Sequence, residues 1–421
     1  MGLGPSTEHL PKLTKQEKEE VLSNECTLQK VAEYIKDKSM KGDLKVCLCT
    51  GAGISVSAGI PDFRTPGTGL YDNLQKYNLP KPESIFDINF FREDPTPFYD
   101  LSRDLLPSNF KPTPMHHFVR LLESKNVLTR CYTQNIDTLE RQAGVTCERV
   151  IEAHGSFATA KCTSCHAEYD QEYFRDRVVN RTDGYKNDRG EIIPWCKCTK
   201  MIEDAETGQK KQCDGDVKPD IVFFGEDLPR RYFDCREQDL LECDLLIIAG
   251  TSLQVTPFAH TVNLCNPRAP RVLINNEIVG RSLSVGDYGL ELNMSRNYRD
   301  VAFIGSCDEG ILLLAELIGW KDELIALIKT DNPSWECPKR TYDKQEVIEK
   351  NFRTAPSADE IEEDEQEEKE ITVTKENAKG PLNAMIDRLD EIKEMQKSLD
   401  EVQGRLDNLD VQGENKDGPA T

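Results

Sequence analysis

The sequence has no run of 18 apolar residues and no hydrophobic signal core near its start, although it is 421 residues long. A membrane-spanning helix needs about 20 mostly apolar residues, and a signal peptide needs a shorter apolar core. We therefore expect neither a membrane span nor secretion, but a cytoplasmic and/or nuclear protein. Positive charge is also scarce, with 53 Lys and Arg against 75 Asp and Glu. Because nucleic-acid phosphates require a basic face, no direct nucleic-acid partner is expected.

Aromatic residues make up only 7% of the chain, but 38% of the residues are hydrophobic, which is enough for a substantial core. The length allows two or three domains. Without a signal peptide, the fifteen cysteines are expected in a reducing compartment. In such a compartment, closely spaced cysteines indicate metal or redox sites before disulfides. Residues 1–6 also match the short N-myristoylation pattern, to which chance matches are common.

A glycine-rich turn, residues 51–56, directly follows the apolar run 44–49, which is typical of a buried parallel strand. Glycines let backbone N–H groups approach a pyrophosphate, and a following helix presents its positive end to the anion. Val56 replaces the third glycine of the dinucleotide fingerprint, so the turn alone also fits a glycine turn without a ligand. Asp62, Phe63 and Arg64 lie just beyond and are suitably placed to close over a bound cofactor.

Further apolar runs alternate with helical patterns along the chain. The expected strands are 127–132, 245–249, 271–274 and 301–304, and the clearest expected helices are 115–122 and 309–318. Alternating strands and helices predict a parallel sheet covered on both faces. Ligands bind outside the carboxyl ends of such strands, where this chain carries Gly250-Thr251-Ser252, Asn275-Asn276-Glu277 and Gly305-Ser306-Cys307. Cys307 is interpreted as a small packing residue whose backbone lies near the nucleotide.

Five cysteines form a candidate metal-binding module: Cys162, Cys165, Cys196, Cys198 and Cys213. Four thiolates complete a tetrahedral zinc site and leave no open position for an activated water. We therefore predict one structural zinc ion rather than a catalytic one. Cys196 and Cys198 compete for the third position, with Cys198 preferred, and the charged stretch 199–212 separates this pair from Cys213. Free structural cysteines are the alternative.

His154 is distinguished from the other histidines by its sequence neighbours. It follows a predicted strand, about twenty residues after the polar side chains Gln134, Asn135 and Asp137. Those side chains come at a strand end and suit hydrogen bonds to a ribose and a carboxamide. An imidazole pKa of about 6.5 suits a general base at neutral pH. The remaining histidines are interpreted as structural: His9, His116, His117, His166 and His260.

Together these motifs closely resemble the sirtuin family of NAD-dependent protein deacylases. The resemblance covers about residues 41–327 and includes the run Lys218-Pro219-Asp220-Ile221-Val222-Phe223-Phe224-Gly225-Glu226. Residues 65–71 are similar to the class I branch, which contains the cytoplasmic and mitochondrial deacetylases. The irregular third cysteine and the insert 199–212 depart from the family pattern in the zinc module, not in the active site.

The resemblance implies NAD-dependent deacylation of acetylated proteins, such as histones or tubulin-like proteins, with release of nicotinamide, O-acetyl-ADP-ribose and free lysine. His154 would take a proton from a ribose hydroxyl, and Asn135 would help to position the nicotinamide. Phe63 would shield the reaction from water. The expected NAD contacts are Gly51, Ala52, Gly53, Ile54, Ser55, Val56, Asp62, Phe63, Arg64, Gln134, Asn135, Ile136, Asp137, Gly250, Thr251, Ser252, Asn275, Asn276, Glu277 and Cys307.

The substrate residues implied by the resemblance are Val222, Phe223, Phe224, Gly225 and Glu226. The first three would line an apolar tunnel for the lysine stem, and the backbone at Gly225 and Glu226 would pair with an extended peptide. Residues 65–71 offer no arginine and tyrosine pair for a succinyl carboxylate, so acetyl and longer fatty acyl groups should be preferred to acidic ones.

The expected fold is α/β, with a Rossmann-like parallel sheet, a smaller zinc-binding module and a helical insert. After a polar, partly helical lead-in over 1–40, the catalytic domain would span 41–330. Within it, the Rossmann-like part would be about 41–65, 120–160 and 217–330. The helical insert would be about 66–115, and the zinc module about 160–216.

The C-terminal region differs in composition from the rest. Residues 356–421 hold 20 acidic and 8 basic residues, so more than half of the net charge of −22 lies there. We predict an acidic disordered linker over 331–380, an amphipathic helix over 381–412 and a disordered tail over 413–421. Met385, Ile392, Leu399 and Leu406 recur every seven residues. This spacing fits a self-associating coiled coil or a partner-binding helix, or alternatively a helix that folds back on the body.

Two other functions use parts of the same pattern. Mono-ADP-ribosyl transfer to protein would break the same bond with a different nucleophile. A non-enzymatic NAD-binding scaffold would use the C-terminal helix for partners. The presence of His154, Asn135 and Asp137 together favours the deacylase, because a binding module has no use for all three.

Overall fold

The computed structural model describes residues 10–349, except 64, 66, 68, 107–109, 181–184, 187–191, 194, 204–207, 281–288 and 293–296. The chain divides into two units, Met1–Thr354 and Ala355–Thr421, and all described residues belong to the first. The predicted amphipathic helix 381–412, the tail 413–421 and the linker beyond residue 349 therefore lie outside the described residues, as do Arg64 and residues 1–9.

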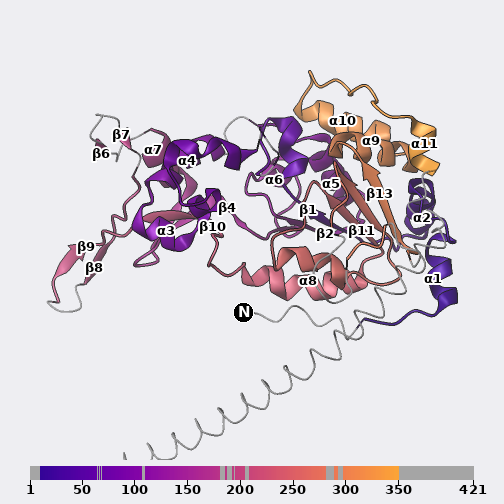
Figure 1. Ribbon diagram of the computed structural model, residues 1–421, viewed down its shortest axis with the longest axis horizontal. Coiled ribbons are helices and arrows are strands. Elements are labelled where there is room, and N and C mark those ends of the chain that lie inside the picture. Colours follow the sequence, from indigo (N-terminus) through magenta and orange to yellow (C-terminus); the bar gives the residue numbers. More distant parts are fainter. Residues whose placement is uncertain are drawn as a thin grey trace, which may run out of the picture. The chain divides into compact units, whose positions relative to one another are not determined.

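A six-stranded parallel sheet forms the centre of the first unit, which confirms the predicted α/β class (Figure 1). Its strand order is β13-β12-β11-β1-β2-β3. The strands are β1 (Val46–Thr50), β2 (Leu128–Thr133), β3 (Val150–Glu152), β11 (Leu245–Ala249), β12 (Arg271–Asn275) and β13 (Asp300–Ile304). The strands β1, β11 and β12 are buried along their whole length, as expected of a parallel sheet covered on both faces.

Helices cover both faces of this sheet, with α8 on one side and α5, α9 and α10 on the other (Figure 1). Alternate side chains of each strand enter the two resulting cores, since Leu48 and Ile247 lie in one and Cys49 and Ile248 in the other. The helices of this part are α1 (Lys15–Leu22), α2 (Leu28–Lys41), α5 (Pro114–Ser124), α6 (Leu139–Gln142), α8 (Arg230–Glu242), α9 (Cys307–Ile318), α10 (Lys321–Asp331) and α11 (Lys344–Glu349), with the 3₁₀ helices η2 (Ala52–Ala58) and η6 (Phe258–Leu264).

A smaller lobe combines the predicted helical insert with the cysteine module around a third, aromatic-rich core. Its central sheet has the order β10-β4-β5 and is antiparallel. The strands are β4 (Gly155–Cys162), β5 (Glu168–Asp170) and β10 (Val217–Ile221), with the two-stranded pairs β6 (Tyr185–Lys186) with β7 (Ile192–Ile193) and β8 (Met201–Glu203) with β9 (Lys210–Gln212). The helices are η3 (Leu70–Asn73), η4 (Gln75–Tyr77), η5 (Pro82–Phe86), α3 (Ile88–Glu93), α4 (Thr96–Leu105) and α7 (Gln171–Val179).

The segments before and after the predicted catalytic domain 41–330 both pack into a core of that domain. In the lead-in, Val31 and Ile35 of α2 are buried in the core that also contains α9. At the other end, Tyr342 packs edge-to-face on Phe303 with ring centroids 5.2 Å apart, and Ile348 is buried in the same core. The start of the predicted linker, residues 331–349, is thus folded against the domain because it carries apolar anchors. Within the described part of the chain, no helix has the length and apolarity to cross a bilayer.

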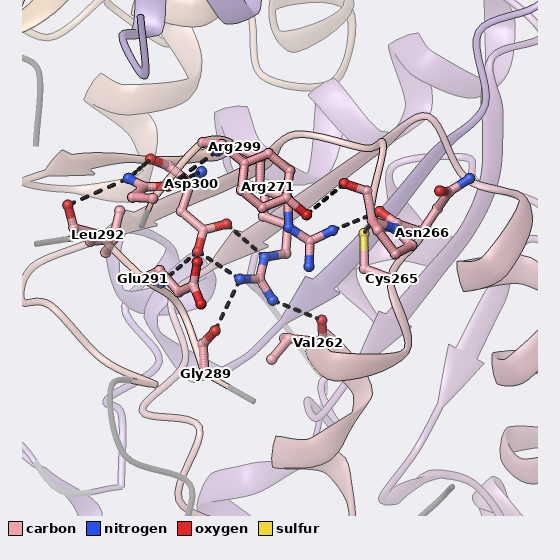
Figure 2. Close-up of polar contacts among 12 residues, drawn as sticks. Val262, Cys265, Asn266, Arg271, Gly289, Glu291, Leu292, Arg299 and Asp300 are labelled. Carbon is pink, nitrogen blue, oxygen red and sulfur yellow. Dashed lines mark hydrogen bonds and ion pairs between the residues drawn. The ribbon is translucent and has the colours of Figure 1, made fainter. Parts of the chain in front are cut away.

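The amino ends of β12 and β13 are joined by a buried ion pair (Figure 2). Arg271, the first residue of β12, donates from Nε and Nη2 to the two Asp300 carboxylate oxygens at 2.6 Å each. Its remaining donors reach the carbonyls of Val262 (3.3 Å) and Gly289 (2.9 Å), and the Glu291 backbone N–H donates to Asp300 at 2.6 Å. This network fixes the return of the chain into β13 at the edge of the sheet.

Candidate active site

A cavity of about 1030 Å³ opens at the carboxyl ends of β1, β2, β11 and β12 and extends to the segment that follows β10. Its size is at the upper end of the roughly 300–1,000 Å³ usual for ligand pockets. The predicted site residues that line it are Ala52, Gly53, Asp62, Phe63, Gln134, Asn135, Ile136, His154, Val222, Phe223, Phe224, Gly225, Glu226, Gly250, Thr251, Ser252, Asn275, Asn276 and Glu277.

The glycines after β1 are required by the packing of two loops against each other. The Gly53 N–H donates to the Gly250 carbonyl at 2.8 Å. A Cβ added at Gly53 would lie 2.6 Å from the Gly250 Cα, and one added at Gly51 would lie 2.8 Å from the Gly250 oxygen. Gly250 itself has a left-handed φ of +59°, which favours glycine. The loops after β1 and β11 therefore meet directly and form one floor of the cavity.

The expected helix after the glycine turn is the seven-residue 3₁₀ helix η2. It ends at Gly59, whose φ of 94° is left-handed, and the Gly59 N–H donates to the carbonyls of Ser55 and Val56. The late position of this glycine, compared with the dinucleotide fingerprint, is explained by its role in ending the short helix. Val56 is 48% exposed and does not line the cavity.

A chain of hydrogen bonds orients the polar residues after β2. The Asn135 amide Nδ2 donates to the Ser55 hydroxyl at 3.2 Å, and that hydroxyl donates to Asp137 Oδ2 at 2.6 Å. The Leu139 N–H donates to the other carboxylate oxygen at 3.0 Å. Because Nδ2 is engaged with Ser55, the rotamer and amide orientation of Asn135 are fixed at the cavity wall. Asp137 is buried behind that wall.

Behind Asp137 lies a buried group that sequence reasoning missed. His116, Asp137 and Glu140 each place one nitrogen or oxygen atom within 4.8 Å of the others. The Thr113 N–H donates to His116 Nδ1 at 3.1 Å, and burial lowers the pKa of His116 to about 3, so the ring is neutral with its proton on Nε2. A protonated Nε2 has no free electron pair for a metal ion, and this N–H is buried without a hydrogen-bond partner among the described residues.

Two carboxyl groups therefore share this buried space. Burial, together with the neighbouring Asp137, raises the pKa of Glu140 to about 8. Burial also raises the pKa of Asp137, although hydrogen bonds from Ser55 and Leu139 oppose the shift. At neutral pH we assign the shared proton to Glu140 and the negative charge to Asp137, because Asp137 accepts the two hydrogen bonds.

His154 follows β3 and faces the cavity. Its Nδ1 lies 3.0 Å from the Gln134 carbonyl oxygen. A carbonyl can only accept, so Nδ1 carries the proton and Nε2 keeps a free electron pair. Burial lowers the pKa of His154, and the hydrogen bond to Gln134 only partly offsets this. The side chain is therefore a neutral imidazole at physiological pH, in the tautomer that a general base requires.

The segment 222–226 after β10 is held between the two lobes. The Val222 N–H donates to the His154 carbonyl at 2.9 Å, and the Phe224 N–H donates to the Phe86 carbonyl at 2.7 Å. In return, the Ile88 N–H donates to the Phe224 carbonyl at 3.1 Å. The Glu226 carboxylate accepts from the Phe223 N–H at 2.8 Å and pairs with the buried Lys218 ammonium at 3.0 Å. This segment forms a braced wall beside His154.

Sequence comparison agrees with the motifs and the site. Residues 51–257 match the Sir2 family. The chain is 48% identical over 318 residues to the NAD-dependent protein deacetylase sirtuin-2 of Danio rerio, covering 73% of this chain and 76% of that protein.

The chain belongs to the Sir2 family. It is also 42% identical over 303 residues to the NAD-dependent protein deacetylase hst2 of Schizosaccharomyces pombe and 39% identical over 306 residues to the NAD-dependent protein deacetylase sirtuin-3 of Mus musculus. Each of these matches covers 72% of this chain and 80% of the relative. The predicted family and its class I branch are both confirmed.

The cysteine module of this sirtuin brings four thiols together: Cys162, Cys165, Cys198 and Cys213, whose sulfur atoms all lie within 4.8 Å of one another. The Sγ atoms of Cys162 and Cys213 are 3.7 Å apart, and those of Cys165 and Cys198 are 3.5 Å apart. Zinc–sulfur bonds of about 2.3 Å give a tetrahedron with edges of about 3.8 Å, so the four thiols can hold one zinc ion.

The fifth cysteine, Cys196, does not belong to this group. It is fully buried, and its carbonyl accepts from the Tyr99 hydroxyl at 3.1 Å. The charged insert 199–212, which made the spacing irregular, contains the paired strands β8 and β9. This hairpin returns Cys213 to the site, where its N–H donates to the Lys200 carbonyl at 2.8 Å.

Some predicted contacts of this sirtuin lie behind the cavity wall rather than on it. Gly51, Ile54, Ser55, Asp137 and Cys307 do not line the cavity. Cys307 is buried at the start of α9, with its Sγ 3.5 Å from the Ile274 carbonyl, as expected of a packing residue. Phe223 is only 1% exposed and packs among aromatic rings, whereas Phe224 is 41% exposed.

Proposed function

We propose that this sirtuin is an NAD-dependent protein-lysine deacetylase that releases nicotinamide, O-acetyl-ADP-ribose and the free lysine. The observation that carries the proposal is the neutral His154 with a free Nε2, facing a cavity that it shares with Asn135 and with the segment 222–226. A base, a positioned amide and a substrate wall in one cavity are what this reaction needs.

The donor set of the cavity fits NAD. Polar side chains at the ends of β2 and β12 converge there, namely Gln134, Asn135 and the 275–277 group. Between them lies the backbone floor formed by Gly53 after β1 and Gly250 after β11. Gln134 is itself oriented, because its Oε1 accepts from the Thr251 hydroxyl at 2.6 Å. When bound, NAD supplies a labile nicotinamide–ribose bond and an ADP-ribose acceptor for the acetyl group.

In this proposal, His154 Nε2 accepts a proton from a ribose hydroxyl while Nδ1 stays bonded to the Gln134 carbonyl. Asn135 and Asp137 position the nicotinamide and ribose, Asn135 directly and Asp137 through Ser55. Phe63 excludes water, which agrees with its packing on Tyr71 and Phe86, with ring centroids 5.7 and 5.9 Å apart.

The substrates are acetylated proteins, and we propose histones or tubulin-like proteins among them. Val222, Phe223 and Phe224 would line the tunnel for the lysine stem, and Gly225 and Glu226 would pair with the peptide backbone. The exposed ring of Phe224 supports an apolar entrance, which suits the neutral stem of an acylated lysine.

The full-length protein, an acetyl-lysine peptide and NAD labelled in its ADP-ribose part provide the test. Deacetylation predicts NAD-dependent loss of acetyl from the peptide, with the label on a small acetylated product. Label transferred to protein instead would indicate ADP-ribosylation, and NAD binding without turnover of an acyl-peptide panel would indicate a scaffold. Either result would contradict the proposal.

We propose that the four clustered cysteines hold one structural zinc ion. Cys198→Ser should lower the bound zinc, measured by elemental analysis, from about one ion per chain to near zero, whereas Cys196→Ser should retain it. Cys147→Ser is the matched control, because Cys147 is an exposed thiol elsewhere in the chain. Full zinc retention in a folded Cys198→Ser protein would refute the assignment.

We further propose the predicted domain limits for the catalytic domain (41–330), a coiled coil or partner-binding helix over 381–412, and a cytoplasmic and/or nuclear location. Free buried thiols and a thiolate zinc site suit a reducing compartment. Removal of residues 381–421 followed by measurement of the molar mass in solution tests self-association through that helix.

A further inference from the structure

Arg236, in the second turn of α8, is a buried cation in the wall of the active-site cavity. It is 6% exposed. The guanidinium carbon lies 5.0 Å from the ring centre of Tyr232 and 4.8 Å from that of Phe233. One terminal nitrogen donates to the Tyr232 hydroxyl at 3.2 Å, while Nε is buried without a hydrogen-bond partner among the described residues.

The charge of Arg236 is not balanced by a carboxylate of the described chain. Two acids on the same helix are engaged elsewhere, because Asp234 pairs with Arg230 at 3.4 Å and Asp239 pairs with Arg130 at 2.8 Å. Guanidinium groups stay charged in proteins, and a buried cation is ordinarily paired. Arg271, which is equally buried, has its Asp300 partner. The missing partner of Arg236 is therefore expected to come from a ligand.

Hydrogen bonds of Tyr232 hold Arg236 in one corner of the cavity. The Tyr232 hydroxyl that accepts from Arg236 also bonds to the Thr261 hydroxyl at 2.6 Å and to the Pro257 carbonyl at 3.3 Å. These bonds fix Arg236 against the turn that carries His260, and His260 lines the same cavity. The corner thus offers a fixed cation and a second hydrogen-bonding ring.

This corner lies within reach of a peptide bound at His154. Successive ring contacts connect the two: His154 to Phe258 at 6.2 Å, Phe258 to Tyr232 at 6.2 Å, and Tyr232 to Arg236 at 5.0 Å. An extended peptide advances about 3.3 Å per residue, so side chains within about five residues of the acetyl-lysine can reach Arg236. Three successive contacts, through the rings of Phe258 and Tyr232, connect Arg236 to His154, so we place the anion on the peptide and not on the acyl group.

We propose that Arg236, with His260 in the lining of the same cavity, binds an anionic side chain of the protein substrate close to the acetyl-lysine. The ligand is a carboxylate or a phosphate group, from Asp, Glu or phosphoserine. This inference rests on the proposed deacetylase function and adds a substrate class to it. A guanidinium pairs well with either anion, because its N–H groups match two oxygens at once.

Acetyl-lysine peptides that carry one Glu or one Gln at each of five positions on either side test this inference, with kcat/KM as the readout. The wild-type enzyme should prefer Glu over Gln about tenfold at one or two positions, as expected for a charged hydrogen bond. Matched phosphoserine and serine peptides distinguish a phosphate from a carboxylate preference. A succinyl-lysine peptide with neutral flanks should gain nothing from Arg236.

Arg236→Gln should reduce the Glu-to-Gln ratio to near one, and Arg236→Lys should keep part of it. Arg230→Gln is the matched control, since it removes the same charge from an exposed position of the same helix and should leave the ratio intact. A wild-type ratio near one at every position, or an unchanged ratio in Arg236→Gln, would overturn the inference. The peptide scan with the wild-type enzyme can by itself overturn the inference, so the test does not depend on whether Arg236→Gln folds. Turnover without preference would leave the deacetylase function standing, whereas no turnover at all would contradict that function.

Discussion

The two ends of the parallel sheet differ in how their buried polar groups are satisfied. At the amino ends, Arg271 and Asp300 form a bidentate pair whose remaining groups reach backbone carbonyls and an N–H. At the cavity end, His116 Nε2, Glu140 Oε1 and Arg236 Nε are buried without partners among the described residues. An unsatisfied buried polar group costs about 1–3 kcal/mol. The buried polar groups at the amino ends are thus satisfied within the chain, whereas these three at the cavity end are not. Of the three, Arg236 lines the cavity and can be reached by a ligand.

The largest expected effect is at the cavity end, on activity. His154→Ala removes the only group identified there as a general base, so kcat/KM should fall about 10²–10⁴-fold. The free energy of unfolding should change little, because the imidazole makes one hydrogen bond to a carbonyl. Steady-state kinetics and thermal unfolding of the same preparation measure both. His166→Asn, at an exposed histidine with a left-handed φ of 56°, is the control; turnover by His154→Ala within a few fold of wild type would contradict the assignment.

At the amino ends of the strands, a substitution should lower the stability and leave the activity intact. Arg271→Met leaves the Asp300 carboxylate buried and unpaired, and should lower the free energy of unfolding by about 3–5 kcal/mol. Deacetylation of the folded fraction at low temperature should be retained, because the ion pair lies at the far end of the strands. The double variant Arg271→Met with Asp300→Leu should recover much of the stability. Chemical denaturation measures these differences, and a double variant no more stable than the single one would argue against an unpaired charge as the cause.

A smaller effect concerns stability at the cavity end as a function of pH. Burial raises the pKa of Glu140 to about 8, so the folded state holds a proton that the unfolded state releases near pH 4.5. The stability of the wild type should therefore fall as the pH rises from about 4.5 to 8. Glu140→Gln removes this dependence and should gain about 2–5 kcal/mol on the wild type between pH 5 and 8. If the free energies of unfolding of the two proteins, measured by chemical denaturation, change with pH in parallel across that range, the raised pKa of Glu140 is disproved.

The smallest effect is a displacement of the pH–activity profile. Because burial lowers the pKa of His154, the neutral base persists below pH 6.5. The acid limb of kcat/KM should therefore have its midpoint below 6.5 and approach a tenfold loss per pH unit beneath it. A midpoint at or above 6.5 for free enzyme would show that the charged imidazole is stabilised instead.

Most of the sheet and its ligand-binding edge were predictable from local patterns. The strand β11 was expected at 245–249 and is Leu245–Ala249, because a short apolar run flanked by polar residues leaves little choice. The residues after the strands follow from the rule that ligands bind at the carboxyl ends. His154 and Asn135 were also predictable, because each follows a predicted strand and has polar neighbours in the sequence.

The remaining features depend on contacts between distant segments. Thr113 and His116 form a capping box at the start of α5, and this signal gives no indication that Glu140 lies opposite. Cys196 and Cys198 are two residues apart, so in extended chain both would point the same way, and local sequence does not distinguish them. The choice of Cys198 depends on where the distant Cys162, Cys165 and Cys213 meet it. Arg236 belongs to a polar helix face in sequence, and its burial arises from Tyr232, Phe233 and the turn at Pro257.

The backbone of the wall segment 222–226 joins His154 to the helical insert. Val222 is bonded to the residue that supplies the base, and Phe224 is bonded on both sides to the helical insert at Phe86 and Ile88. In the proposed function, the segment that pairs with the peptide is therefore tied by its own main chain to His154, the proposed base. Phe233 and Arg236 line the cavity from α8 and take no part in these main-chain bonds, so substitutions there should change substrate preference and keep the alignment of His154. A change in the path of the segment should instead displace the proposed peptide wall and His154 together.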